Sequence, residues 1–502
     1  MTLRRNLLAG MTSSVWSALL GFAVVPLYLK YLGIEAYGLI GFFTTTQALL
    51  SLLDLGLAPT MNREVARCSA SGNIKEAGAL LHTLAVVYWA MAAFIALIIL
   101  TVAPIIAQHW LQPKHIPQAT VSHTVMLMGL VAAARWPIGL YQGALIGAHR
   151  MTISSGVTIA MTTLGSAGAV AILAFVSPTI QAFFIWQACI GLIYAATMRG
   201  AAWRIVGRPE SVRFEFGKLK SIWSFSTAMS GLAVLGLVFT QLDKVILSKV
   251  LGLGEFAHYM LATLVANGLL VIISPVFNTI YPQFTSLVVA DNTKKLISMY
   301  RMGTRMLATV LFPATILLAV FSSDLVRMWL ANEDAALQVA PIISLLAIGT
   351  ALHSIMYFPY ALQLAYGMVR LPIAICIVLI ILMAPLIIFF ALQYGALGGA
   401  IAWLILNVLY VLSGTWLTHR YLLKGIGGKW LIRDVGIPLA ISILVGMVEY
   451  YAVHKAAYPA YLRLLCGGIL SLVASLLSLL ISPQLRLAAL QRLKLKTEDA
   501  QA

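Results

Sequence analysis

Long apolar segments dominate this sequence and limit its possible folds more than any other feature. Stretches such as 79–106, 371–392 and 461–481 are apolar over the length that an α-helix needs to cross a lipid bilayer. Only 10% of the 502 residues are charged, against about 25% in soluble domains. The stretches also lack the alternating pattern of a membrane β-barrel. We therefore predict an all-α, multi-pass membrane protein.

Segments of this length predict about fourteen transmembrane helices. The predicted spans are 7–29, 36–58, 79–106, 119–146, 152–176, 180–198, 221–246, 256–281, 304–326, 336–366, 371–392, 396–418, 434–453 and 461–481. With the N-terminus in the cytoplasm, the predicted outer loops hold few basic residues, namely Lys30, Lys114, Lys249, Arg327, Lys455 and Arg463. This bias is typical of membrane proteins and predicts that both termini are cytoplasmic.

Other sequence patterns narrow the functional classes. The net charge of +17 follows from the basic cytoplasmic loops, so no nucleic-acid partner is expected. The four cysteines are far apart and lack metal-binding spacing, which predicts neither a metal site nor a disulfide. No GxxxxGK[ST] motif occurs, so we expect no nucleotide cofactor and no direct use of ATP.

A weak internal repeat divides the chain. "LKYLGIEAYG" (29–38) is similar to "SKVLGLGEFA" (248–257), and "QGALIGAHR" (142–150) is similar to "QLAYGMVR" (363–370) at nearly the same offset. Two halves of like orientation would be related by a pseudo-two-fold axis along the membrane normal, as in known transporters. The predicted organisation is a six-helix lobe at 1–198, a basic cytoplasmic linker at 199–220, a second six-helix lobe at 221–420, and two additional helices with a basic cytoplasmic tail at 421–502.

Several motifs carry a resemblance to a known family. They are "YLG…YG" and "LLDLGL" within 26–67, "YQGALIGAHR" at the end of the fourth span, and "QLDKVILSKVLG" in the seventh. Through residue 420 the chain resembles Wzx-type flippases of lipid-linked O-antigen units. These belong to the multidrug/oligosaccharidyl-lipid/polysaccharide exporter superfamily.

The resemblance implies a transporter and not an enzyme, in the bacterial inner membrane. Its expected substrate is an undecaprenyl-diphosphate-linked oligosaccharide, moved from the cytoplasmic to the periplasmic leaflet by alternating access and coupled to an ion gradient. It also implies contact with membrane lipids, a polysaccharide polymerase and a chain-length regulator as candidate partners, and a monomeric state. The alternatives are a MATE-type multidrug or cation antiporter, a MurJ-type lipid II flippase and, ranked lower, a membrane glycosyltransferase or polymerase.

Arg135 is the leading candidate for substrate binding. It lies near the middle of the fourth span, where a charge is costly and is usually functional. Pro137 follows it and is expected to kink the helix. A guanidinium there could bind a diphosphate or an acidic sugar. The alternative is an ion pair with a carboxylate from another helix.

Other cations and aromatic residues are weaker substrate-binding candidates. Arg4 and Arg5 precede the first span and could attract a diphosphate at a cytoplasmic mouth. His353 and Tyr357 lie in the tenth span, the counterpart of the fourth. They could contact sugar or an ion, although His353 could equally make an ordinary polar contact in the core.

Three acids are candidates for ion coupling. Asp54 lies at the cytoplasmic end of the second span, where it is expected either to order the turn "GLAPT" or to meet Arg63. Glu449 lies at the end of the thirteenth span and is expected near the outer interface, with partial hydration.

Asp243 is the third of these acids, and Lys244 follows it in the seventh span. Successive helical residues point about 100° apart, which predicts that these two side chains do not pair. Lys244 is then a candidate for substrate binding by a positive charge that faces the cleft. The alternative is that its side chain extends toward the membrane surface.

Overall fold

A computed structural model describes residues 2–71, 74–207, 216–454 and 458–481, which are helical and contain no β-strand. Residues 208–215 of the predicted linker, the side chain of Arg4 and residues 482–502 of the basic tail lie outside the described part. The chain divides into two compact units, Met1–Ala257 and His258–Ala502.

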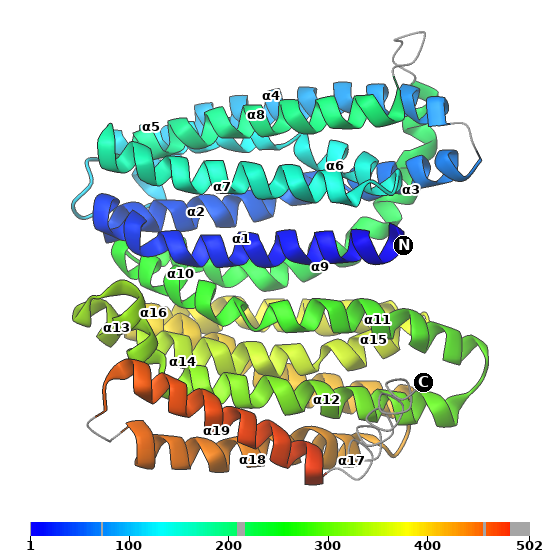
Figure 1. Cartoon of the computed structure of the whole chain (residues 1–502), viewed down its shortest axis with the longest axis vertical. Helices are drawn as coiled ribbons and strands as arrows, with labels where there is room; N and C mark the ends of the chain where they lie inside the picture. The colour runs from blue at the N-terminus through cyan, green and yellow to red at the C-terminus, as the bar shows by residue number, and fades with distance from the viewer. Residues whose placement is uncertain (1, 72–73, 208–215, 455–457, 482–502) are drawn as a thin grey trace, which may run out of the picture. The chain divides into compact units, whose positions relative to one another are not determined.

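The first unit contains nine α-helices and one short 3-10 helix in its described residues (Figure 1). They are α1 (Thr2–Leu32), α2 (Ile34–Leu50), η1 (Ser51–Asp54), α3 (Leu57–Ala70), α4 (Ile74–His109), α5 (Gln118–Arg135), α6 (Ile138–Gly147), α7 (Met151–Phe175), α8 (Ile180–Val206) and α9 (Phe216–Val250). Helix α10 (Leu253–Asn267) begins in this unit and ends in the second.

The second unit continues with α-helices and two short π-helices, η2 and η3. Its elements are α11 (Leu270–Val289), α12 (Thr293–Val320), α13 (Ser322–Leu330), α14 (Glu333–Ile355), α15 (Tyr357–Ala365), α16 (Arg370–Tyr421), α17 (Gly427–Lys429), η2 (Trp430–Gly436), α18 (Ile437–Val448), η3 (Glu449–His454) and α19 (Ala460–Ile481).

Eleven segments of the described residues are long and apolar enough to cross a membrane. The longest, α16, contains Gly395 at a φ of 58°, which separates the two predicted spans 371–392 and 396–418. The all-α, multi-pass membrane prediction is confirmed. The count of fourteen spans, the orientation and the lobe boundaries stay predictions.

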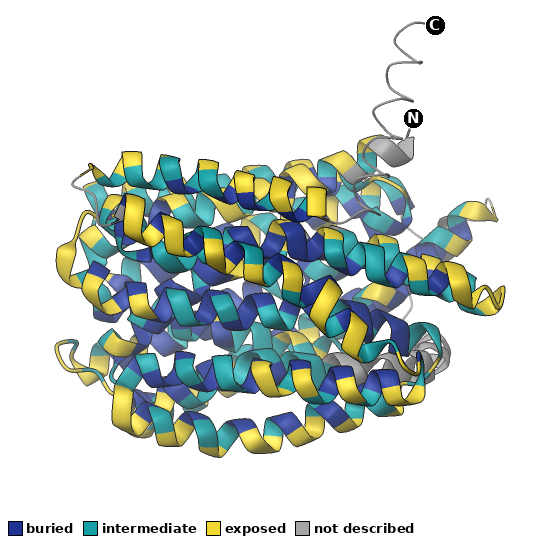
Figure 2. Cartoon of the chain, turned by 90° about the horizontal axis from the view of Figure 1, so that it is seen from below, coloured by how far each residue is buried: buried dark blue, intermediate teal, exposed yellow. Residues whose placement is uncertain are grey.

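Burial along the helices distinguishes core faces from outer faces (Figure 2). On α19, Ser471, Ala474 and Ser478 are buried, whereas Leu472 and Leu476 are exposed. An exposed apolar face costs nothing in lipid, so we interpret the leucine face as lipid-facing. Small residues on the opposite face let helices approach closely.

Two predicted spans are interrupted at comparable places. Helix α5 ends at Arg135, Pro137 follows, and α6 begins at Ile138. This confirms the kink expected at Pro137, because proline supplies no N–H to the helix. In the second unit α14 ends at Ile355 and α15 begins at Tyr357.

The motif "YQGALIG" holds α6 against α3. An added Cβ at Gly143 would lie 2.6 Å from the Ala58 carbonyl oxygen, and one at Gly147 would lie 2.3 Å from the Asn62 carbonyl oxygen. Glycines four residues apart therefore let the two backbones touch, as in membrane helix pairs. The close contact holds Ala58, which lines the cavity beside Arg135, against α6.

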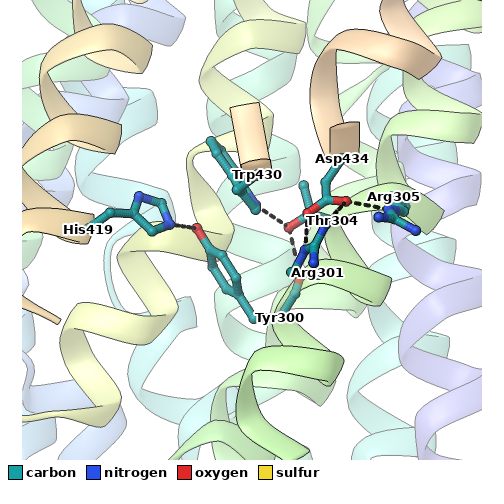
Figure 3. Close-up of polar contacts among 7 residues, drawn as sticks. All are labelled: Tyr300, Arg301, Thr304, Arg305, His419, Trp430 and Asp434. Atoms are coloured by element: carbon teal, nitrogen blue, oxygen red, sulfur yellow. Dashed lines mark hydrogen bonds and ion pairs between the residues drawn. The ribbon is translucent and has the colours of Figure 1, made fainter. Parts of the chain in front are cut away.

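The additional helices α18 and α19 pack on α12, and buried ion pairs join η2 to α12 and α19 to α13. Asp434 on η2 is fully buried, accepts a hydrogen bond from Arg301 Nε at 2.7 Å, and also pairs with Arg305 (Figure 3). In the other pair, Arg463 on α19 donates to buried Asp324 at 2.5 Å. A buried carboxylate is tolerated where cations satisfy it, so these pairs set the register of the helices.

Aromatic side chains extend the Asp434 cluster. The rings of Tyr300 and Trp430 stack with centroids 5.8 Å apart, and Trp430 Nε1 donates to Thr304 Oγ1 (Figure 3). The Tyr300 hydroxyl lies 3.2 Å from His419 Nε2, in hydrogen-bond contact. The cluster thus joins α12, α16 and η2 within the second unit.

Candidate functional site

A cavity of about 300 Å³ lies in the first unit, beside the α5–α6 break. It forms where the end of α2, the turn η1, helix α4 and the break converge. The side chains and backbone around it belong to Gln47, Leu50, Ser51, Asp54, Ala58, Tyr88, Ala132, Arg135, Trp136 and Gly139. Two of the predicted site residues, Arg135 and Asp54, therefore meet in one cavity.

Arg135 is the cation of this cavity. Its Nη2 donates to the Gln187 Oε1 atom on α8 at 2.5 Å, and Gln187 Nε2 in turn lies 3.3 Å from the Gly165 carbonyl oxygen. No carboxylate of the described residues lies within ion-pair distance of Arg135. The amide orients the guanidinium without neutralising it, so the positive charge can serve an anionic ligand.

The packing of α8 supports this position of Arg135. A Cβ on Gly191 would lie 3.1 Å from Ala134 Cβ and 3.3 Å from Arg135 Cγ. Since such contacts are tighter than usual, glycine allows α8 to approach α5 closely. That approach brings Gln187 within reach of the guanidinium.

Asp54 is the acid of the cavity and also orders the turn before α3. Its carboxylate accepts from the Ala58 N–H at 3.3 Å and from the Tyr88 hydroxyl. Leu55 and Gly56 have φ values of 48° and 77°, so a tight left-handed turn lies between η1 and α3. The predicted role in ordering "GLAPT" is confirmed, since the carboxylate satisfies an N–H at the start of α3.

Aromatic and amide groups complete the cavity. The Trp136 indole N–H is buried and has no hydrogen-bond partner in the described residues. The rings of Trp136 and Tyr88 have centroids 6.3 Å apart. Unpaired donors and ring faces suit sugar hydroxyls and sugar faces, and Arg135 suits an anion. Sequence reasoning missed Tyr88, Trp136 and Gln187, because each takes its role from residues distant in sequence.

His353 and Tyr357 lie in a different setting, within the second unit. His353 Nδ1 is 3.1 Å from Asn407 Oδ1, and its ring is surrounded by those of Tyr357, Trp403 and Tyr410. Tyr357 borders an apolar void of only about 10 Å³. The described side chains leave no room for a sugar there in this conformation.

The prediction that Asp243 and Lys244 do not pair is wrong. Lys244 Nζ lies 3.0 Å from Asp243 Oδ1 and also donates to the Thr240 carbonyl oxygen at 2.8 Å. The lysine side chain is long enough to fold back over the 100° between neighbouring Cβ atoms, and burial favours pairing. Lys244 is only 8% exposed, so its charge is neutralised in this conformation.

The turn "SKVLG" has a structural role at the end of α9. Lys249 Nζ donates to the His109 carbonyl oxygen at 2.9 Å, and Trp110 Nε1 donates to Ser248 Oγ at 3.0 Å. In the matching turn of the first half, the Glu35 carboxylate accepts from the backbone N–H groups of residues 114–116. The sequence analysis did not identify Glu35.

The remaining candidates lie away from the cavity. Arg5 is exposed near the N-terminus. Glu449 is 1% exposed and faces Ser471, halfway along α19. Its carboxyl group is therefore enclosed by packed helices, and its expected place near the outer interface stays a prediction.

Two known proteins have sequences similar to this chain. A protein of Shigella flexneri described as an O-antigen transporter is 22% identical over 420 residues, covering 81% of this chain and 97% of its own. An uncharacterised membrane protein from the cps region of Klebsiella pneumoniae is 24% identical over 317 residues, and the match spans 63% of that protein.

Among solved structures, the lipid II flippase MurJ in an inward closed conformation is similar with a TM-score of 0.68 at 13% identity. The match covers 94% of this chain and 97% of MurJ. An inward-facing MATE multidrug transporter is similar with a TM-score of 0.65 at 11% identity, covering 82% of this chain and 96% of that one. At these identities the likeness establishes the fold alone.

The sequence itself matches a family over residues 30–336, which is more than half of the chain. The family is described as "Polysaccharide biosynthesis protein". The match includes α2 to α8 and hence the whole cavity around Arg135. This multi-pass membrane protein therefore belongs to the polysaccharide biosynthesis protein family.

Proposed function

We propose that this protein is a flippase for a lipid-linked oligosaccharide in polysaccharide biosynthesis. It moves an undecaprenyl-diphosphate-linked repeat unit from the cytoplasmic to the periplasmic leaflet of the bacterial inner membrane. The family match, the O-antigen transporter relative and the flippase fold support a transporter rather than an enzyme.

One observation carries the proposal furthest. Arg135 places a positive charge in a largely apolar cavity inside the membrane-spanning part, with an amide and no carboxylate as its partner. A charge in such a place is costly and needs a compensating ligand. A diphosphate or an acidic sugar supplies that compensation through charge-assisted hydrogen bonds.

The other groups of the cavity suit the sugar part of the substrate. Gln47 offers a hydrogen-bond donor, and the partly buried Trp136 ring offers an apolar face. A cavity of about 300 Å³ is the size of a small-ligand site, so it would hold one part of the substrate at a time. The full cycle alternates access between the two sides and draws on an ion gradient.

The partners proposed for this function are membrane lipids, a polysaccharide polymerase and a chain-length regulator, with the flippase acting as a monomer. The polymerase would use the unit that the flippase delivers to the periplasmic leaflet. Co-purification from native membranes, followed by mass measurement of the intact complex, tests both the partners and the monomeric state.

Reconstitution tests the function. Purified protein in proteoliposomes should move a lipid-linked oligosaccharide across the bilayer, and collapsing both proton and sodium gradients should slow this movement to a small residual rate. Arg135→Gln should reduce the rate roughly ten- to hundredfold. Arg150→Gln removes an exposed arginine from the same unit and is the matched control. Absence of movement by the wild-type protein would contradict the proposal.

A second candidate function is antiport of organic cations, as in MATE transporters. The observation in its favour is Asp54, a carboxylate in the same cavity. An antiporter predicts that Asp54→Asn abolishes resistance to cationic drugs in a sensitive strain. A flippase predicts no such resistance with or without the substitution.

A further inference from the structure

Glu449 is a buried carboxyl group for which the proposed substrate cavity gives no role. It is 1% exposed and begins the π-helix η3, which packs against α12, α18 and α19. Its Oε1 atom lies 3.3 Å from Ser471 Oγ, and its Oε2 atom has no hydrogen-bond partner in the described residues. Short π-helical segments occur often at functional sites.

Ser471 has too few donor hydrogens to satisfy both an ionised Glu449 and the Pro313 carbonyl. Ser471 Oγ lies 3.3 Å from Glu449 Oε1 and also 3.3 Å from the Pro313 carbonyl oxygen. A hydroxyl has one hydrogen to donate, whereas a carboxylate and a carbonyl only accept. Two acceptors would then compete for one hydrogen. A protonated Glu449 removes the conflict, because it donates to Ser471, which donates to Pro313.

No charged partner in the described residues replaces that proton. On the elements packed against η3, the cations Arg301 and Arg305 bind Asp434, and Arg463 binds Asp324. None lies within ion-pair distance of Glu449. The other titratable groups on η3, α12 and α19 with described side chains are Lys294, Lys295, Tyr300, Tyr450, Tyr451, Tyr461 and Cys466. Burial without a cation favours the neutral carboxylic acid.

The Pro313 carbonyl belongs to the part of α12 that can bend most easily. Proline lacks an N–H, so the carbonyl of Thr309 loses its helical donor. The Thr309 hydroxyl is also buried without a partner in the described residues. Helices kink at such points. A change in the bend of α12 would move the Pro313 carbonyl away from Ser471 and change the environment of Glu449.

We propose that Glu449, Ser471 and the Pro313 carbonyl form a proton-binding site between α12, η3 and α19. Glu449 is protonated in this conformation and releases its proton when α12 bends at Pro313. The coupling of this proton to transport rests on the proposed function. By linkage, a state that binds the proton more tightly is favoured as the proton concentration rises.

Infrared spectroscopy tests the protonation state directly on the full chain in lipid. The wild-type protein should show a carboxylic-acid C=O band at neutral pH, and Glu449→Gln should lack it. Ser471→Ala should shift the band, because the acid loses its hydrogen-bond acceptor. Asp324→Asn is the matched control, since Asp324 is equally buried but pairs with Arg463 and should contribute no acid band. Identical spectra for the wild type and Glu449→Gln would overturn the site.

Transport measurements separate the proton site from the flippase function. A proton gradient should accelerate flipping by the wild-type protein. In Glu449→Gln the rate should stay within about twofold of the rate without a gradient. An undiminished response of Glu449→Gln to the proton gradient, or dependence on sodium alone, would overturn the coupling. Failure of the wild type to flip any lipid-linked oligosaccharide would instead reject the proposed function and leave the spectroscopic result intact.

Discussion

Two helix interruptions, α5–α6 and α14–α15, have different surroundings. The first borders a cavity of about 300 Å³ that is lined by Arg135 and by largely apolar surface. The second lies beside His353 and Tyr357, where aromatic rings leave a void of about 10 Å³. The difference teaches that a repeated helix interruption is a structural device. The side chains next to it decide whether it becomes a binding site.

The largest effect is expected at the α5–α6 break, where a substitution should impair transport itself. Arg135→Ala should reduce surface polysaccharide roughly a hundredfold, because the cavity loses its only described cation. His353→Ala should act mainly by lowering the amount of folded protein. Polysaccharide normalised to the membrane protein level measures both. Equal normalised losses would mean that the aromatic cluster also serves the substrate.

The second comparison adds a larger side chain beside each of the two breaks. Ala361→Leu adds volume where the void is about 10 Å³, and overpacking of this kind costs about 1–3 kcal/mol of stability. Ala132→Leu projects into the larger cavity and should leave stability nearly unchanged while slowing transport. Thermal unfolding in detergent measures the first effect and proteoliposome flux the second. Strong destabilisation by Ala132→Leu would show that the cavity is smaller in solution.

The charge of Arg135 can be tested without removing it. Gln187→Glu keeps the size of the side chain but gives Arg135 a carboxylate partner. Flux should fall about tenfold because the anionic substrate competes with a fixed anion. Asn407→Asp is the corresponding change beside His353 and should leave flux per folded molecule unaltered. Normal flux in Gln187→Glu would argue against anion binding at Arg135.

The smallest effect concerns two tyrosines. Tyr88→Phe removes the hydroxyl that donates to Asp54, and the loss should cost about 1–2 kcal/mol of stability. Tyr357→Phe removes a hydroxyl that borders an apolar void and should cost less. Unfolding temperatures of the two variants, measured side by side, rank them. The reverse order would place the more important polar contact in the second unit.

Apolar length predicted the fold class well, because it reflects the solvent of the protein rather than its packing. Arg135 and Pro137 were also identifiable, since a charge and a proline inside an apolar span are local signals. Tyr88 and Gln187 were not, because their roles depend on helices that meet only after folding.

The prediction that Asp243 and Lys244 do not pair failed for another reason. Helical geometry fixes the direction of Cβ atoms, but the lysine tip lies several bonds beyond its Cβ and can turn back. The burial of Glu449 against Ser471 could not be predicted either, because it depends on how η3 and α19 pack.

The ion pairs around Asp434 have a consequence for synthesis. The ribosome makes Arg301 and Arg305 about 130 residues before it makes Asp434, so α12 must enter the bilayer without its counter-charge. Until the later helices arrive, both guanidinium groups need water, lipid phosphates or the insertion machinery. Chains that stop before residue 434 would therefore lack the carboxylate that both guanidinium groups bind, a mark by which membrane quality control could recognise an unfinished product.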